Sequence, residues 1–181
     1  MKKWKALLAE QDIAPRYINC DFENHPAISH RWLEIVDYVK APQGNIFMSG
    51  SCGNGKTLTA VAIFAFYISK YGAGARFFNT ESLYPTWLNE SRHGFPGDLA
   101  LRLSRSPLLV LDDLGQGDIS DSFKRWLYSI INRRWEFEQP IVCTTNLASP
   151  EFREVFGDAI LSRLMDGRVW KFEGRDHRIP V

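Results

Sequence analysis

The residues with the clearest chemistry form a glycine-rich run, Gly50-Ser51-Cys52-Gly53-Asn54-Gly55-Lys56-Thr57. The run matches the pattern GxxxxGK[ST] at every position. Glycines let such a loop curl until successive backbone N–H groups point at phosphate oxygens, and a helix N-terminus adds positive field. Lys56 is placed to reach the β- and γ-phosphates of a nucleotide, and the Thr57 hydroxyl to bind Mg²⁺. We assign the Cys52 side chain to packing and not to redox chemistry.

Two acids and an amide follow apolar runs farther along the chain. The run 108–111 leads into Asp112 and Asp113, and the run 141–145 ends at Asn146. Open α/β sheets bind ligands at the carboxyl ends of their strands. We expect Asp112 to hold Mg²⁺ through water, Asp113 to polarise an attacking water, and Asn146 to orient that water or touch the γ-phosphate. The residue types alone also allow a helix cap or loop acid at Asp113 and a turn at Asn146.

Alternating strands and helices must position these residues. Short apolar runs predict strands at 45–49, 75–79, 108–111, 141–145 and 168–172. Helical spacing predicts helices at 1–12, stopped by Pro15, and at 27–40, 56–71, 119–137, twice within 81–105 and twice within 149–165. Strands that are apolar throughout are buried on both faces, which predicts an α/β fold with a parallel sheet wrapped by helices. The glycine-rich loop then lies between a strand and a helix, as its chemistry requires.

The composition fits one ordinary domain. The chain has 181 residues, 45% hydrophobic and 24% charged, with a net charge of +1. Any affinity for nucleic acid must therefore come from local patches. The three cysteines form no CxxC pair, which argues against a disulfide framework or zinc site and favours a reducing cytosol. We find no signal peptide and no apolar run near the ~20 residues that cross a bilayer, so we expect a cytoplasmic protein without a membrane partner.

In order and spacing, the phosphate loop, LLVLDDLG and TTNL resemble the Walker A, Walker B and sensor 1 elements of the AAA+ ATPases. The flanks are similar to the DnaC/IstB family of helicase loaders and transposition helper ATPases. The segments that carry this likeness are Pro15-Arg16-Tyr17, Asp21-Phe22-Glu23-Asn24, Asn132-Arg133-Arg134-Trp135, 157–164 and 174–178. The resemblance covers roughly residues 14–179. It implies a three-layer P-loop fold with the sensor strand between the Walker A and Walker B strands, and ATP with Mg²⁺ as cofactors.

The resemblance also implies roles for two arginines. Arg163 matches an arginine finger that projects into the nucleotide site of a neighbouring copy in a homo-oligomer, and a guanidinium suits that task because it stays charged and forked. Arg178 matches the second sensor, which reaches the nucleotide of its own subunit. An ordinary surface ion pair is the alternative for each. The implied catalytic set is Lys56, Asp112, Asp113, Asn146 and Arg163; the nucleotide ligands are residues 50–57 and Arg178; the metal ligands are Thr57 and Asp112.

The sequence departs from the wider AAA+ pattern in three places. Asp113 stands where most members carry Glu, and its shorter side chain predicts slow or partner-stimulated hydrolysis. The chain stops at Val181, which leaves no room for a separate lid domain. Only about twenty residues precede the core. We therefore expect an AAA+ ATPase domain over 21–181 and a short amino-terminal segment over 1–20 whose helix contacts a partner.

The leading hypothesis is a DnaC-like loader that hydrolyses ATP and assembles on single-stranded DNA with a replicative hexameric helicase. An IstB-like helper that binds a transposase and duplex DNA is the near alternative, and a small P-loop kinase or a non-hydrolysing ATP switch are more distant ones. Cationic side chains that track phosphates would come from a helical hairpin and a long helix. The candidates are Arg92, His93, Lys124, Arg125, Arg133 and Arg134, for which solvated helix faces are the alternative reading.

Overall fold

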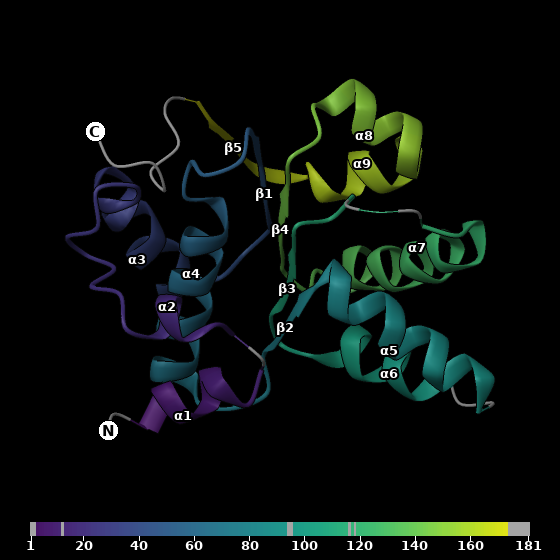
Figure 1. Cartoon of the computed structure of the whole chain (residues 1–181), viewed down its shortest axis with the longest axis horizontal. Coiled ribbons are helices and arrows are strands. Elements are labelled where there is room, and N and C mark those ends of the chain that lie inside the picture. Colours follow the sequence, from purple (N-terminus) through teal and green to yellow (C-terminus); the bar gives the residue numbers. More distant parts are fainter. Residues whose placement is uncertain (1–2, 12, 94–95, 116, 118, 174–181) are drawn as a thin grey trace.

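A parallel sheet lies between two layers of helices (Figure 1). The computed structural model describes residues 3–11, 13–93, 96–115, 117 and 119–173. Its five strands are β1 (Asn45–Gly50), β2 (Arg76–Asn79), β3 (Leu109–Asp112), β4 (Ile141–Thr145) and β5 (Gly167–Phe172). They stand in the order β2-β3-β4-β1-β5, and all pairs are parallel. The predicted three-layer α/β fold is confirmed, including the strand β4 between β1 and β3.

Each helical layer covers one face of the sheet (Figure 1). The first layer holds α1 (Lys3–Ala9), α2 (Pro15–Ile18), α3 (Trp32–Lys40) and α4 (Lys56–Tyr71). The second holds α5 (Thr80–Arg92), α6 (Pro96–Arg105), α7 (Asp121–Glu136), α8 (Ser149–Phe156) and α9 (Asp158–Leu164). Successive strand residues face opposite layers. Ile46 and Met48 of β1 accordingly pack with α4, whereas Phe47 packs with Phe152 of α8.

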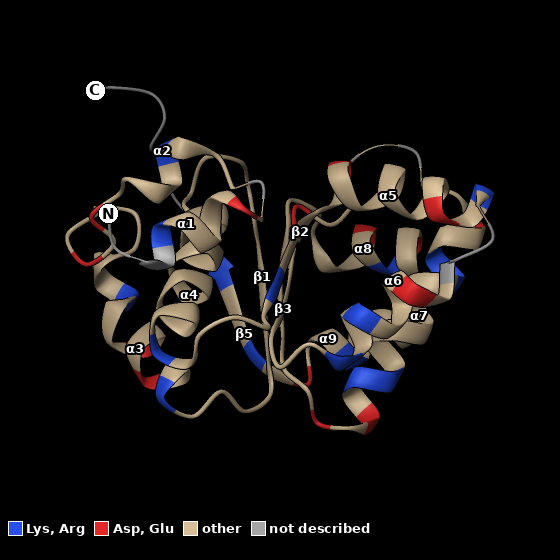
Figure 2. Ribbon diagram, turned by 90° about the horizontal axis from the view of Figure 1, so that it is seen from below, with Lys and Arg blue, Asp and Glu red and all other residues tan. Residues whose placement is uncertain are grey.

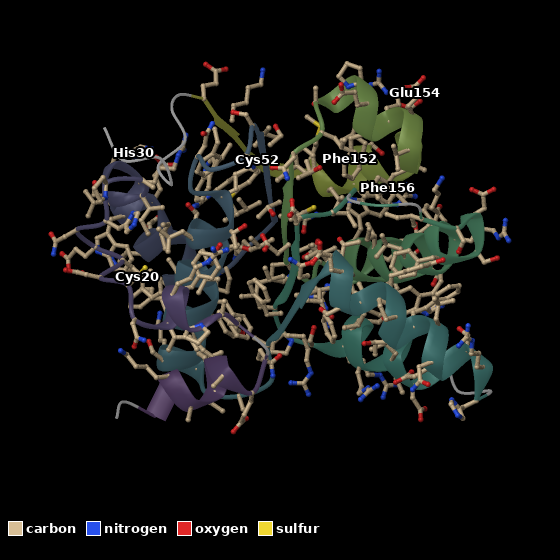
Figure 3. All side chains as sticks on the ribbon, viewed as in Figure 1. Cys20, His30, Cys52, Phe152, Glu154 and Phe156 are labelled. Atoms are coloured by element: carbon tan, nitrogen blue, oxygen red, sulfur yellow. The ribbon has the colours of Figure 1, made fainter. Side chains whose placement is uncertain are left out.

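Helix α8 shows how the second layer is oriented. Phe152 and Phe156 lie on its inner side in the core, while Glu154 points outward (Figure 3). None of the helices in the described residues is long and apolar enough to cross a membrane.

The amino-terminal boundaries differ from the expected ones. The first helix ends at Ala9, and Pro15 opens α2 instead of only ending a helix. Proline suits a first helical position because its missing N–H has no partner there anyway. The helix expected over 27–40 begins at Trp32, after a 3₁₀ turn at Ser29–Arg31.

The described residues of the segment 1–20, which are 3–11 and 13–20, pack on the core of the domain. Leu8 is fully buried and Ile13 is 5% exposed, both in the cluster that α4 shares with the sheet. That the helix in this segment contacts a partner stays a prediction.

Arg134 of α7 is fully buried, and its hydrogen bonds connect α7 to the segments that precede β3 and β4. Its guanidinium donates to the carbonyl oxygens of Leu103 (2.6 Å), Ser106 (2.8 Å) and Pro140 (2.7 Å), just before β3 and β4 begin. Burial lowers its pKa to about 10. The expectation that Arg134 contacts DNA is therefore wrong, because its cationic group already binds backbone oxygens inside the protein.

Candidate nucleotide-binding site

The loop from Gly50 to Thr57 joins the carboxyl end of β1 to the start of α4. Gly50 and Gly55 have φ angles of +145° and +94°, which side chains rarely adopt. A Cβ at Gly50 would overlap the Phe172 carbonyl, and one at Gly55 would lie 2.8 Å from the Cβ of Ala27. Both glycines are thus required by space as well as by conformation, and the loop is held against β5 and the segment before α3.

Lys56 is the first residue of α4, and its side chain turns back into the loop. Its Nζ donates to the carbonyl oxygens of Gly50 and Ser51, each at 2.7 Å, and the residue is 5% exposed. The ammonium is therefore held at the centre of the loop, where phosphates would bind. The next residue, Thr57, forms a side-chain hydrogen bond with Asp112 of β3.

The structure brings the predicted acids and amide together. Asp112 Oδ1 accepts a hydrogen bond from the Thr144 hydroxyl (2.6 Å), and Asp113 Oδ1 accepts one from the Asn146 amide (2.6 Å). The Asp113 N–H donates to the same Thr144 oxygen (2.8 Å). The acids at the end of β3 and the polar residues at the end of β4 thus form one hydrogen-bonded cluster beside Lys56.

Asp112 is 2% exposed, and its carboxylate is costly to ionise. Its pKa is raised to about 6, chiefly by burial and also by the adjacent Asp113, while hydrogen bonds from Thr144 and Thr57 and the charge of Lys56 oppose the rise. A buried anion of this kind is stabilised by a cation. The Asp112 carboxylate and the Thr57 hydroxyl are both hard oxygen donors, which are the ligands that Mg²⁺ prefers. These two residues therefore fit the predicted metal site.

A cavity of about 320 Å³ opens beside this cluster. Its lining includes Cys52, Lys56, Thr57, Asp113 and Asn146. It also includes residues that we did not predict as part of the site, namely Arg16, Tyr17, Cys20, His25 and Ala27. The only sequence signal for them was the family-like segment around Arg16 and Tyr17. The cavity thus brings polar groups of the phosphate loop and the strand ends together with the aromatic ring of Tyr17 and the apolar side chain of Ala27.

Two cysteines line the cavity without facing each other. Cys52 is exposed on the loop, and Cys20 lies beside α2, well apart from it (Figure 3). The assignment of Cys52 to packing is wrong, because its loop position projects the side chain away from the core.

Arg163 lies away from the cavity, on α9. Its backbone carbonyl accepts from the side chain of Asn45, the first residue of β1, whereas the phosphate loop follows the last one. Its guanidinium donates to Asn132 Oδ1 (2.8 Å) and stands 5.2 Å from the ring centres of Tyr128 and Trp135. The surface ion pair considered for Arg163 is replaced by these contacts with α7. Arg178 lies outside the described residues.

The candidate DNA-contacting residues lie on the second helical layer. Arg92 and His93 are exposed at the end of α5. On α7, Lys124 pairs with Asp121 (3.3 Å) and Arg133 stacks over the Phe137 ring (5.0 Å). Lys and Arg gather where α7 and α9 lie (Figure 2). None of these residues lines the nucleotide cavity. That they contact DNA stays a prediction.

Comparison with known proteins yields one family. A family model described as IstB-like ATP binding protein matches residues 11–172. A relative from Geobacillus stearothermophilus, named as an ATP-binding protein of insertion sequence IS5376, is 25% identical over 169 residues. The match covers 88% of this chain and 66% of the relative, so the chain spans just under two thirds of that relative's length.

Solved structures share the fold. The crystal structure of the DnaC helicase loader superposes with a TM-score of 0.76 at 25% identity, over 88% of this chain and all of that one. AMPPCP-bound DnaA from Aquifex aeolicus superposes with a TM-score of 0.74 at 19% identity, over 91% of this chain and 53% of that one. The chain therefore has the P-loop AAA+ fold of these proteins.

Proposed function

The chain belongs to the IstB-like ATP-binding protein family, and from that premise we propose that it is an ATPase whose Mg·ATP cycle drives assembly with a DNA-processing partner. One observation carries the proposal. Lys56, Thr57, Asp112, Asp113 and Asn146 meet at one edge of the sheet, next to a cavity large enough for a nucleotide. This set combines phosphate binding, metal binding and the orientation of water.

Each side chain has a distinct task in hydrolysis. Lys56 and the loop amides bind the phosphates, and Thr57 and Asp112 hold Mg²⁺. Bound Mg²⁺ would neutralise charge on the phosphate oxygens during transfer. Asp113, oriented by the Asn146 amide at 2.6 Å, accepts a proton from the attacking water. The water oxygen bonds to the γ-phosphorus while the bond from that phosphorus to the bridging oxygen of ADP breaks, so ADP and inorganic phosphate leave.

The proposed partner is a replicative hexameric helicase, which this protein would load on single-stranded DNA. The superposition on the DnaC helicase loader, over all of that chain, supports this partner. The relative from an insertion sequence supports the second candidate, a transposition helper that acts with a transposase. In both cases Arg163 would complete the nucleotide site of a neighbouring copy, because it lies at the far end of β1 from the site of its own chain.

The experiment that tests the activity measures phosphate release from Mg·ATP by the purified chain and its Asp113→Asn variant. We expect free phosphate from the parent and a loss of about 100-fold or more in kcat for the variant, because the oriented base is removed. Glu154→Gln, an exposed carboxylate on the outer side of α8, is the matched control and should behave as the parent. Phosphate transferred to a small acceptor in place of water would contradict the ATPase assignment.

The same Asp113→Asn variant distinguishes the two partners. Since it should bind ATP without hydrolysing it, its complexes should persist during affinity capture from the native host. Recovery of a hexameric helicase would support the loader, and recovery of a transposase would support the helper.

A further inference from the structure

We propose that Thr144 is a positioning residue for both acids, because its buried hydroxyl joins the carboxylate of Asp112 to the backbone of Asp113. The inference rests on the proposed function, since these acids would hold the metal and orient the water. Thr144 opens the TTNL segment, but from the sequence we assign a role only to Asn146 of that segment and interpret Thr144 as an ordinary strand residue.

The two hydrogen bonds of this hydroxyl have fixed directions. Thr144 is 1% exposed, and its Oγ1 lies 2.6 Å from Asp112 Oδ1 and 2.8 Å from the Asp113 nitrogen. A carboxylate only accepts and an N–H only donates. The hydroxyl proton therefore points to Asp112, and an oxygen lone pair points to the Asp113 N–H.

These bonds begin where regular strand pairing stops. The last paired residues of β3 and β4 are Leu111 and Cys143. Two residues later, Asp113 has a φ of +59°, which is uncommon for a residue other than glycine and turns the chain out of the sheet. The backbone carbonyl of Thr144 also accepts from the Leu114 N–H at 2.8 Å. Thr144 thus hydrogen-bonds to the three residues 112–114, which directly follow the last residue of β3 that pairs with β4.

This arrangement connects the metal-binding acid to the water-orienting pair. A shift of the Asp112 carboxylate moves the Thr144 hydroxyl, and with it the Asp113 backbone. The Asp113 carboxylate in turn accepts a hydrogen bond from the side-chain amide of Asn146, at 2.6 Å. A valine at 144 keeps the shape of threonine but removes one of the two hydroxyl donors to the buried Asp112 carboxylate and leaves the Asp113 N–H without its acceptor.

The test compares Thr144→Val and Thr144→Ser with the parent. Binding of a fluorescent ATP analogue is titrated with Mg²⁺ and in EDTA, and kcat and KM are measured separately. In EDTA, we expect Thr144→Val to bind the analogue with the same affinity as the parent. With Mg²⁺, its affinity should be about tenfold lower than that of the parent, and its kcat should be about 10–100-fold lower. Thr144→Ser, which keeps the hydroxyl, should recover both to within about threefold.

Thr80→Val is the matched control. Thr80 is also buried, at 4% exposure, but its hydroxyl approaches the backbone oxygen of Asp112 (3.4 Å) and not the carboxylate. It should retain the Mg²⁺ dependence and kcat of the parent. Thr144→Cys, with similar size and only a weak donor, replaces Thr144→Val if the valine variant does not fold, and the same losses are expected.

The inference is overturned if the valine or cysteine variant keeps the parental Mg²⁺ dependence and kcat, or if Thr80→Val loses as much. Those results would leave the proposed ATPase intact. A parent protein that binds no Mg·ATP would instead overturn the proposed function, and this inference with it.

Discussion

The residues with expected catalytic roles lie in two regions that are built in opposite ways. At the carboxyl edge of the sheet, Asp112, Asp113 and Asn146 are hydrogen-bonded to one another or to a shared threonine. Asp113 and Asn146 line one cavity together with Lys56. At the amino edge, the Arg163 guanidinium contacts the side chains of α7 and the backbone of α9, all within the second layer of its own chain. The first region gathers several of the expected catalytic residues within one chain, whereas the second holds a single expected catalytic residue away from them.

The two regions lie at opposite ends of strand β1. Asn45 holds the Arg163 carbonyl at the first residue of β1, and Gly50 opens the phosphate loop at the last. At about 3.3 Å per residue, these strand ends lie roughly 16 Å apart. A catalytic Arg163 would therefore serve the site of a second copy. The comparison teaches that nucleotide binding is testable on single chains, whereas the contribution of Arg163 is testable only on assemblies.

The largest expected effect is that of Lys56→Ala on the first region. Removal of the ammonium from the centre of the loop should lower ATP affinity by about 100-fold or more and abolish hydrolysis, because the triphosphate loses its main charge partner. Calorimetric titration with ATP measures the loss. Lys70→Ala, in the exposed last turn of the same helix, should bind ATP as the parent does. Unchanged affinity in Lys56→Ala would break the assignment of the loop.

Arg163→Ala, in the second region, should lower the rate of hydrolysis without changing nucleotide binding at the first region. We expect nucleotide affinity close to that of the parent and a fall in kcat of about 1,000-fold, since only the contribution from the neighbouring copy is lost. Mixing Arg163→Ala with Lys56→Ala should restore part of the activity, because a Lys56→Ala copy can supply Arg163 to an intact loop. Arg153→Ala, an exposed arginine on α8, is the control. No recovery on mixing would argue against a shared site.

Asp112→Asn, in the first region, should raise the unfolding free energy of the protein when metal and nucleotide are absent. Burial raises the pKa of Asp112 from 3.8 to about 6, so the folded protein holds this proton more tightly than the unfolded chain. The parent should therefore lose stability as the pH rises from about 4 to 6. Asparagine removes that loss, and the gain in unfolding free energy should be roughly 2–3 kcal/mol at pH 7.5 and under about 1 kcal/mol at pH 4.

Urea unfolding at the two pH values measures this gain, with Glu154→Gln as an exposed control. A gain for Asp112→Asn that does not depend on pH would show that the buried charge is not the cause.

The smallest effect concerns the second layer and DNA. Arg133→Gln should weaken binding to single-stranded DNA by a few-fold and reduce the salt dependence of log affinity by about one unit, because one phosphate contact is lost. Fluorescence anisotropy with a labelled oligonucleotide at several salt concentrations measures both. Arg153→Gln serves as the control. Equal affinities and salt slopes for Arg133→Gln and the parent would identify Arg133 as part of a solvated helix face.

The sequence predicted where the residues of the first region lie because its signals are local. The loop of residues 50–57 is a contiguous motif, and Asp112 and Asn146 follow apolar strands whose ends a parallel sheet must align. The burial of Arg134 could not be read in this way, since it depends on where α6 ends and β4 begins. Thr144 and the cavity wall around Tyr17 were missed for the same reason: each acquires its role from a segment distant in sequence.

The most direct test of the central claim is a crystal structure of the chain with Mg²⁺ and a non-hydrolysable ATP analogue. We expect the triphosphate inside the loop of residues 50–57, with Lys56 on its terminal phosphates and the ion beside Thr57 and Asp112. We also expect Asp113 and Asn146 to face the γ-phosphate. A triphosphate bound outside the loop, or an ion remote from Asp112, would contradict this claim.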